Sequence, residues 1–230
     1  YEDLGTELFQ QLNGQFAFAL WDERKKILLL ARDRMGIRPL FYHLRGSRLL
    51  FGSEIKTIFA DPSVNRQLDV QSASDIFTCW SPLGSATAFK DIYHLLPGHY
   101  AVYKDGTLRT APYWRLTFTN GQDSERPFSS YLEELSALLF DATKIRLRAD
   151  VPVGAYLSGG LDSTYVTALV KKHFDNRLRT FSVSFSDERF DEAPFQLKAV
   201  DALQTDHRMI RCTERDIGEN LPDVIWHTEV

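Results

Sequence analysis

Apolar residues alternate with other residues near the start of the chain. In the segment GQFAFALWDERKKILLLARD, Phe16, Phe18 and Leu20 follow a period of two, and the polar stretch Asp22–Lys26 separates them from an apolar run that begins at Ile27. A period of two is typical of a strand with one face in a core, and a short polar break between two such segments indicates a turn. The segment therefore predicts a β-hairpin.

Two further hairpins are predicted in the first half of the chain. The segments PLFYHL and RLLFGS flank a turn at Arg45–Ser47, and the segment GHYAVYKDGTLRTAPYW turns at Asp105–Gly106. Glycine at these turns supplies the positive φ that tight hairpin connections need. With a short helix expected at residues 54–59, the first half is predicted to be mostly antiparallel β.

The pattern changes after a polar stretch at Thr117–Pro127, TFTNGQDSERP, which has no period and predicts a linker. The segment SSYLEELSALLFDATKIRL then has leucines near helical spacing, with Ser129 or Ser130 as the expected cap. Strands and helices alternate from there, which predicts a parallel, doubly wound sheet. The expected order after that first helix is strand 151–157, helix 163–173, strand 179–185, helix 193–203, strand 208–211 and helix 217–227.

Composition narrows the function to small-molecule chemistry in a globular protein. The 230 residues are 43% hydrophobic and 13% aromatic, and their net charge of −4 comes without any block of like charges. Neither a nucleic acid nor an anionic membrane is therefore an expected partner. The two cysteines, Cys79 and Cys212, are too far apart to suggest a disulfide framework or a zinc site, which fits a reducing, cytoplasmic setting.

The ends of the sequence suggest an internal piece of a longer protein. The chain starts at Tyr1 without a signal-like segment and stops at Val230 just after a helical pattern. Its longest apolar run, Ile27–Ala31, is far shorter than the roughly 20 residues that a membrane-spanning helix needs.

The segment Leu157–Thr164, LSGGLDST, carries the candidate chemistry. It connects a predicted strand to a predicted helix, so it should lie at the carboxyl edge of the sheet, where ligands of such sheets bind. Its two glycines would let backbone N–H groups approach an anion, and its three hydroxyls would add donors, which suits phosphate oxygens. The loop is not a Walker A motif, because no lysine follows the last glycine.

Asp162 adds a metal to this hypothesis. A carboxylate in a phosphate-binding loop would repel its ligand unless a divalent cation lay between them, which suggests Mg²⁺. The alternative is that Asp162 caps the following helix and the glycines only make a tight turn.

The segment Ser158–Ser163, SGGLDS, resembles the pyrophosphate loop of the N-type ATP pyrophosphatases. Its wider context, LRADVPVGAYLSGGLDSTYVTAL, resembles the synthetase domain of glutamine-dependent asparagine synthetases. In the first half, LNGQFAFALWD, ARDRMGIRPLFY and FGSEIKTI resemble the later part of that family's class II glutaminase domain. The resemblance covers nearly the whole chain and consists of two independent sets of motifs in the family's order.

The resemblance implies a fold, a set of domains and a nucleotide site. The fold is α/β overall, with a partial antiparallel β-sandwich of the glutaminase type (α+β) at residues 1–116, a linker at 117–128, and the first part of a parallel, doubly wound synthetase domain at 129–230. The family would use the loop for the β- and γ-phosphates of ATP, with Mg²⁺, and the ends of the first two parallel strands for adenine. The implied nucleotide-binding residues are Ser158, Gly159, Gly160, Asp162 and Ser163 for the phosphates and Tyr156 and Val183 for the adenine.

Tyr156 departs from the aliphatic residue that is usual at its position, and core packing is the alternative role for both Tyr156 and Val183.

The implied reaction makes asparagine. The aspartate side chain attacks the α-phosphorus of ATP, β-aspartyl-AMP and pyrophosphate form, and ammonia then displaces AMP. The family obtains that ammonia from glutamine through an N-terminal cysteine, and neither this cysteine nor the family's glutamine-pocket motifs occur in the sequence. The residues given should therefore neither hydrolyse glutamine nor complete synthesis on their own, and asparagine formation by them would contradict this. The resemblance leaves open whether the protein is a homodimer.

Other candidate residues are predicted to be mainly structural. Asp33, Arg34, Gly36 and Arg38 match a glutaminase-domain signature but resemble a charged turn, and Cys79 and Cys212 are expected to be buried rather than nucleophilic. Glu54 and Lys56 are expected to open a short helix. Asp191 and Glu192 should cap a helix or lie near the nucleotide, and His227–Glu229 either resembles a segment near the aspartate or metal site or is a surface helix end.

Three alternatives remain open at this stage. A β-lactam synthetase-like or peptide-cyclising amide ligase would keep the adenylating loop and change the acceptor. A pyrophosphatase that modifies tRNA or makes GMP or NAD would also share the loop, although the β-rich first half argues against it. The third alternative is a truncated, non-catalytic module that binds a partner protein.

Overall fold

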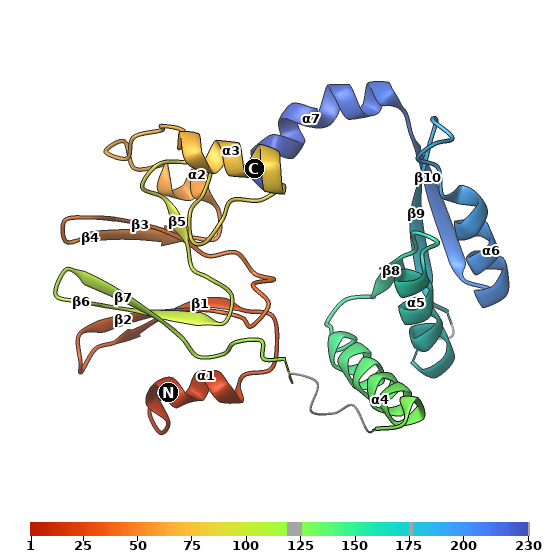
Figure 1. Cartoon of the computed structure of the whole chain (residues 1–230), viewed down its shortest axis with the longest axis horizontal. Coiled ribbons are helices and arrows are strands. Elements are labelled where there is room, and N and C mark those ends of the chain that lie inside the picture. The colour runs from red at the N-terminus through yellow and green to blue at the C-terminus, as the bar shows by residue number, and fades with distance from the viewer. Residues whose placement is uncertain (119–125, 175–176, 230) are drawn as a thin grey trace. The chain divides into compact units, whose positions relative to one another are not determined.

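The computed structural model describes residues 1–118, 126–174 and 177–229. The chain divides into two compact units, one formed by Tyr1–Phe118 with Ile225–Val230 and the other by Thr119–Val224. Figure 1 shows the elements of each unit. Most of the predicted linker, residues 119–125, lies outside the described residues.

The first unit contains two antiparallel sheets, with strand orders β1-β2-β6-β7 and β4-β3-β5 (Figure 1). The three predicted hairpins are confirmed as the pairs β1–β2, β3–β4 and β6–β7. The strands are β1 Ala17–Asp22, β2 Ile27–Arg32, β3 Phe41–Arg45, β4 Arg48–Gly52, β5 Tyr93–His94, β6 His99–Lys104 and β7 Thr107–Pro112.

The two sheets pack against each other through one apolar cluster. Leu30 of β2 and Ala101 of β6 are fully buried there, and Leu49 of β4 packs against them from the other sheet. Because β2 is buried on both faces, its neighbouring residue Ala31 contacts a second cluster, around Phe9 of the helix α1 (Leu8–Gln11). The predicted β-sandwich of the first unit is therefore confirmed.

Helices cover the outer face of the smaller sheet. Ile55 and Ile58 of α2 (Ile55–Ile58) are buried beside Ile92, and Phe41 and Leu50 of the sheet pack against them. The predicted short helix is thus present. The short 3₁₀ helix Gly5–Glu7, the helices α1 and α3 (Val70–Cys79) and the strand β5 were not predicted.

The second unit is built on a three-stranded parallel sheet with the order β10-β9-β8, which confirms the predicted parallel α/β arrangement. Two elements, β9 and α6, have the predicted bounds. The elements are α4 Phe128–Arg146, β8 Gly154–Tyr156, α5 Leu161–His173, β9 Arg179–Phe185, α6 Ala193–Leu203, β10 Asp206–Cys212 and α7 Glu214–Thr228, whose last residues belong to the first unit.

Three predicted elements begin two or three residues earlier than expected: α5 at Leu161 instead of 163, β10 at Asp206 instead of 208 and α7 at Glu214 instead of 217. Two other predicted starts, those of α4 and β8, are wrong for identifiable reasons. The helix α4 begins at Phe128, and neither Ser129 nor Ser130 caps it, because Pro127 holds the N-cap position and its carbonyl accepts a hydrogen bond from Ser130 N (3.0 Å). The strand β8 is shorter than predicted because only Gly154–Tyr156 pair with β9. Among the described residues, no helix combines the length and apolar character needed to cross a membrane.

Candidate functional site

The candidate loop leaves the sheet at the carboxyl end of β8. Leu157, which is 1% exposed, donates its backbone N–H to the carbonyl of Phe181 on β9 (2.8 Å), and the chain then turns toward α5. The buried leucine fixes the base of the loop in the core, while Ser158 and Gly160 lie exposed. The loop is thus at the edge of the sheet where open parallel sheets bind ligands.

The two serine hydroxyls hold the loop closed. Their oxygens are 2.9 Å apart, and the Ser163 hydroxyl also accepts from Ser158 N (3.3 Å) and donates to the carbonyl of Gly160 (3.2 Å). The Ser158 hydroxyl lies 3.4 Å from Gly160 N. The structure therefore brings the sequence-predicted Ser158, Gly160 and Ser163 together.

Glycine is required at one of the two predicted glycine positions. Gly159 has φ +83°, and a Cβ atom there would lie 2.8 Å from Gln196 N and 2.9 Å from the Phe195 Cβ. Gly160 has φ −72° and is the N-cap of α5, where no side chain caps the helix. The first N–H groups of this 13-residue helix thus receive no side-chain cap and carry its positive dipole end.

Asp162 lies in the first turn of α5, so the alternative that it caps the helix is wrong. Its side chain is exposed, and it has no hydrogen bond or ion pair among the residues that the structure describes. Within the same residues, no group of three or more His, Cys, Asp or Glu side chains could hold a metal ion. One free carboxylate nevertheless suits Mg²⁺, which takes one or two protein carboxylates and completes its shell with oxygens of a ligand and of water.

Tyr156 and Val183 are both accessible from solvent. Tyr156, which pairs in register with Phe181, is 86% exposed, and Val183 is 43% exposed. Packing in the core therefore does not describe Tyr156 in this structure. A cavity of about 610 Å³ beside the loop is lined by residues of α4, β8 and α5, including Tyr156, Asp162 and Ser163.

Polar side chains of the turn after β2 form hydrogen bonds with the protein backbone. Asp33 is 1% exposed, and its carboxylate accepts hydrogen bonds from four backbone N–H groups at 3.0 to 3.2 Å, those of Phe16, Met35, Ile37 and Arg38. Burial would raise the pKa of Asp33, but these bonds outweigh it and hold the pKa below its ordinary value. Asp33 is therefore structural, as predicted.

Arg32 is a buried residue of this turn that the sequence did not single out. It is 9% exposed, and its guanidinium donates to the carbonyls of Arg38 (2.9 Å), Gly36 (2.7 Å) and Leu95 (2.7 Å). Gly36 has φ +65°, and a Cβ atom there would lie 2.8 Å from the Pro97 Cγ. Arg34 donates to the Gln10 carbonyl (3.0 Å), so the predicted signature residues form a braced turn.

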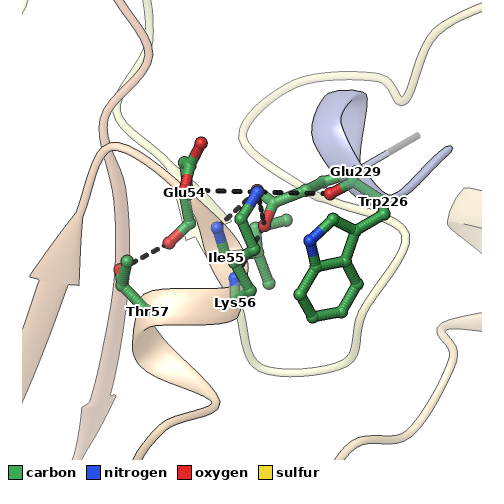
Figure 2. Close-up of polar contacts among 6 residues, drawn as sticks. All are labelled: Glu54, Ile55, Lys56, Thr57, Trp226 and Glu229. Carbon is green, nitrogen blue, oxygen red and sulfur yellow. Dashed lines mark hydrogen bonds and ion pairs between the residues drawn. The ribbon is translucent and has the colours of Figure 1, made fainter. Parts of the chain in front are cut away.

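Figure 2 shows where Glu54, Lys56 and Glu229 lie. The Glu229 carboxylate accepts from the backbone N–H groups of Ile55 (2.5 Å) and Lys56 (2.7 Å), so it caps α2. Lys56 Nζ lies 3.2 Å from the Glu54 carboxylate and donates to the Trp226 carbonyl (3.2 Å). Glu229 therefore holds the segment from Ile225 within the first unit, a role that no sequence pattern indicates.

The remaining candidates are the acidic pair before α6 and the two cysteines. Asp191 accepts from Phe185 N (3.0 Å) and Ala193 N (3.4 Å), which confirms its capping role at the start of α6, whereas the N-cap residue Glu192 makes no side-chain cap. Cys212 is partly buried and Cys79 is exposed, so the prediction of a buried side chain is wrong for Cys79, which lies at the last position of α3.

Two protein-family models match the chain in sequence order. Residues 1–114 match a glutamine amidotransferase domain, and residues 134–230 match asparagine synthase. The first match covers the β-sandwich unit with the braced Asp33 turn. The second covers the parallel sheet with the Ser158–Ser163 loop.

Individual relatives align along nearly the whole chain. The glutamine-hydrolyzing asparagine synthetase 3 of Bacillus subtilis is 33% identical over 98% of this chain, and a putative glutamine-hydrolyzing asparagine synthetase 2 of Methanocaldococcus jannaschii is 32% identical over 98%. A Penicillium rubens protein named amidase chyE is 30% identical over 100% of the chain. The chain spans 39%, 44% and 36% of the lengths of these three relatives, respectively.

Proposed function

Because the chain belongs to the glutamine-dependent asparagine synthetase family, we propose that it contributes the adenylating loop of a ligase that makes asparagine from aspartate, ATP and a nitrogen donor. The observation that carries this proposal is the Ser158–Ser163 loop, which joins a parallel strand to a helix N-terminus without a side-chain cap and carries an exposed carboxylate that has no partner among the described residues. The complete gene product that contains residues 1–230, hereafter the complete protein, would be the active enzyme.

The proposed chemistry has two steps. A side-chain oxygen of aspartate attacks the α-phosphorus of ATP, the bond from that phosphorus to the bridging oxygen breaks, and pyrophosphate leaves with its electron pair. Ammonia then attacks the acyl carbon of β-aspartyl-AMP, AMP leaves, and one proton is released. No general base is required in the first step, because the attacking carboxylate is already ionised at neutral pH.

The loop would assist the first step through electrostatics. Negative charge accumulates on the departing pyrophosphate, and the backbone N–H groups at the start of α5, with the hydroxyls of Ser158 and Ser163, are donors already held near one another. Asp162 would hold Mg²⁺, which neutralises phosphate charge when bound. The absence of a Walker lysine is consistent with this division of roles.

Tyr156 and Val183 would contact the adenine of ATP. Tyr156 is the last residue of β8, Val183 lies two residues before the end of the adjacent strand β9, and both are accessible, which supports a ligand-facing role. The nitrogen donor would be glutamine, hydrolysed by the glutaminase domain of the complete protein, or free ammonia. A reducing, cytoplasmic location and a homodimeric assembly also stay proposals.

One observation supports a second candidate acceptor. The Penicillium rubens relative is named an amidase rather than an asparagine synthetase. An amide ligase with the same adenylating loop and a different carboxylate substrate, of the β-lactam synthetase-like or peptide-cyclising kind, therefore stays an alternative.

The test uses the complete protein with ATP, Mg²⁺ and glutamine, with and without aspartate, and identifies the nucleotide and amino-acid products. The proposal expects AMP that depends on aspartate, with one asparagine formed for each AMP. AMP formation without dependence on aspartate would favour the second candidate. ADP, or no turnover, would contradict the assignment of the loop.

A further inference from the structure

The carboxyl end of β9 extends past β8, one of its two neighbouring strands. Among the described residues, the last backbone–backbone hydrogen bond between the β8 side and β9 is that of Leu157 N to the carbonyl of Phe181, and the Leu157 carbonyl accepts from the Ser182 hydroxyl instead (2.5 Å). The chain then turns into the loop, while β9 continues to Phe185. Carbonyls two residues apart on a strand point to the same side. The carbonyl of Val183 therefore faces the position that β8 has vacated, at the edge where the nucleotide is proposed to bind.

A side chain of α6 takes the place of the missing strand. Gln196 Nε2 donates to the Val183 carbonyl at 3.0 Å, and Gln196 is only 2% exposed. Because the partner is a carbonyl, the amide must present its nitrogen there. This orientation leaves Oε1 buried and without a hydrogen-bond partner among the described residues.

The backbone of the same residue contacts the loop. A Cβ atom on Gly159 would lie 2.8 Å from Gln196 N, so the loop at this point is in contact with the first turn of α6. Gln196 thus touches two segments assigned to the nucleotide, one for the phosphates and one for the adenine.

Stability alone does not account for a glutamine at this position. The side chain gains one hydrogen bond, but its buried Oε1 lacks a donor, and an unsatisfied buried acceptor costs at least as much as one net hydrogen bond contributes. A methionine would fill nearly the same volume and remove the orphaned Oε1, but it would leave the Val183 carbonyl without this donor, so the number of unsatisfied polar groups would hardly change. The glutamine is therefore better explained by the carbonyl that it holds than by the stability of the fold.

We propose that Gln196 is a positioning residue that holds the end of β9 in register with the Gly159 turn, so that the adenine and phosphate ends of one ATP molecule are bound at the correct spacing. The inference rests on the proposed function and assigns no contact between Gln196 and the substrate. Its consequence is selective: Gln196 should matter for ligands that contain adenine and much less for pyrophosphate alone.

The test compares Gln196→Met with a matched control, Thr180→Val, in the complete protein. Thr180 is fully buried near the opposite end of β9, and its hydroxyl bonds Thr205 (2.7 Å) and His207 (2.9 Å), so the control also removes buried hydrogen bonds from this strand. Binding of ATP, AMP and inorganic pyrophosphate is measured by calorimetry with Mg²⁺, and the unfolding temperature is measured alongside.

For Gln196→Met we expect ATP and AMP to bind about fivefold to tenfold more weakly, pyrophosphate affinity to change less than about twofold, and the unfolding temperature to be retained. For Thr180→Val we expect a lower unfolding temperature and unchanged affinities. Equal losses for AMP and pyrophosphate, unchanged AMP binding, or an unfolded Gln196→Met protein would each overturn the positioning role. If the wild-type protein binds none of the three ligands, the proposed function is wrong, and the inference about Gln196 is then wrong as well.

Discussion

Two loops, one in each unit, follow a strand and combine an aspartate with a glycine of positive φ, but they treat the aspartate in opposite ways. Asp33 is 1% exposed and accepts four backbone hydrogen bonds, whereas Asp162 is exposed and bonds no described residue. Gly36 and Gly159 each approach a neighbour so closely that a Cβ atom would clash at 2.8 Å. The first loop has committed its carboxylate to its own backbone, and the second has left its carboxylate available to a ligand.

The comparison gives a rule for reading such motifs. A carboxylate that accepts its hydrogen bonds from the protein stabilises the fold, so its removal should lower the free energy of unfolding. A carboxylate that the protein leaves unmet contributes little to stability, and its loss should appear in ligand binding or turnover. A loss of stability on replacing Asp162, together with a loss of turnover but not of stability on replacing Asp33, would contradict this rule.

The largest expected effect follows from Asp162→Asn. Removing the charge that would hold Mg²⁺ should lower the rate of aspartate-dependent AMP formation by about 10²-fold to 10³-fold, the loss typical of one group that stabilises developing charge. The unfolding midpoint in urea should stay unchanged, since no protein contact is lost. Asp201→Asn, an exposed carboxylate on α6, is the matched control and should keep the wild-type rate. A wild-type rate in Asp162→Asn would contradict the assignment.

The next effect is the loss of stability in Asp33→Asn. An amide in place of the carboxylate would present a donor to backbone donors and weaken at least two of the four bonds, so we expect the free energy of unfolding to fall by about 3 kcal/mol. Urea unfolding of the complete protein measures this loss. Asp3→Asn, at an exposed position, should lie within about 0.5 kcal/mol of wild type. A small effect of Asp33→Asn with a large loss of AMP formation would reverse the roles of the two loops.

A third prediction separates the cost of a steric clash from the cost of backbone strain, by comparing Gly36 in the Asp33 turn with Gly46 in the turn between β3 and β4. Gly36 and Gly46 both have positive φ, +65° and +59°, but a Cβ atom meets the Pro97 Cγ at Gly36 and nothing within 4 Å at Gly46. Gly46→Ala should therefore cost about 1 kcal/mol, from strain alone, and Gly36→Ala about 2 kcal/mol or more. Equal losses for the two variants in urea unfolding would show that the close contact at Gly36 contributes nothing.

Local pattern was sufficient for much of the fold. The hairpins could be predicted because alternation and a glycine turn are properties of neighbouring residues, and β9 and α6 were predicted to their bounds for a similar reason. The extent of β8 could not be predicted in this way, because a strand ends where its partner stops pairing with it. The start of α4 was also missed, because Pro127 and not Ser129 or Ser130 occupies the N-cap position.

The loop of the candidate site could be predicted from the sequence, but the residues that hold neighbouring segments in place could not. Glycines, hydroxyls and an aspartate in one short segment mark the loop directly. Gln196 gave no such signal, because a glutamine on an amphipathic helix is exposed by default, and only the fold shows that it is buried against Val183. The capping of α2 by Glu229 could not be predicted either, because Glu229 is far from α2 in the sequence and meets it only in the folded chain.

The smallest expected effect is a difference in pH dependence, which appears only at acidic pH and again concerns Asp33. The pKa of Asp33 lies below the value near 3.9 of an unfolded aspartate, because backbone hydrogen bonds to the carboxylate outweigh its burial. The unfolded state therefore takes up its proton first as the pH falls, so this contribution is complete above about pH 5 and is lost as the pH falls through the folded pKa. Urea unfolding between about pH 5 and pH 2.5 should give a steeper loss of stability in wild type than in Asp33→Asn, which has no carboxylate to titrate. Parallel pH profiles would mean that the four hydrogen bonds do not favour the ionised form, and the distinction between the two aspartates would then depend on burial alone.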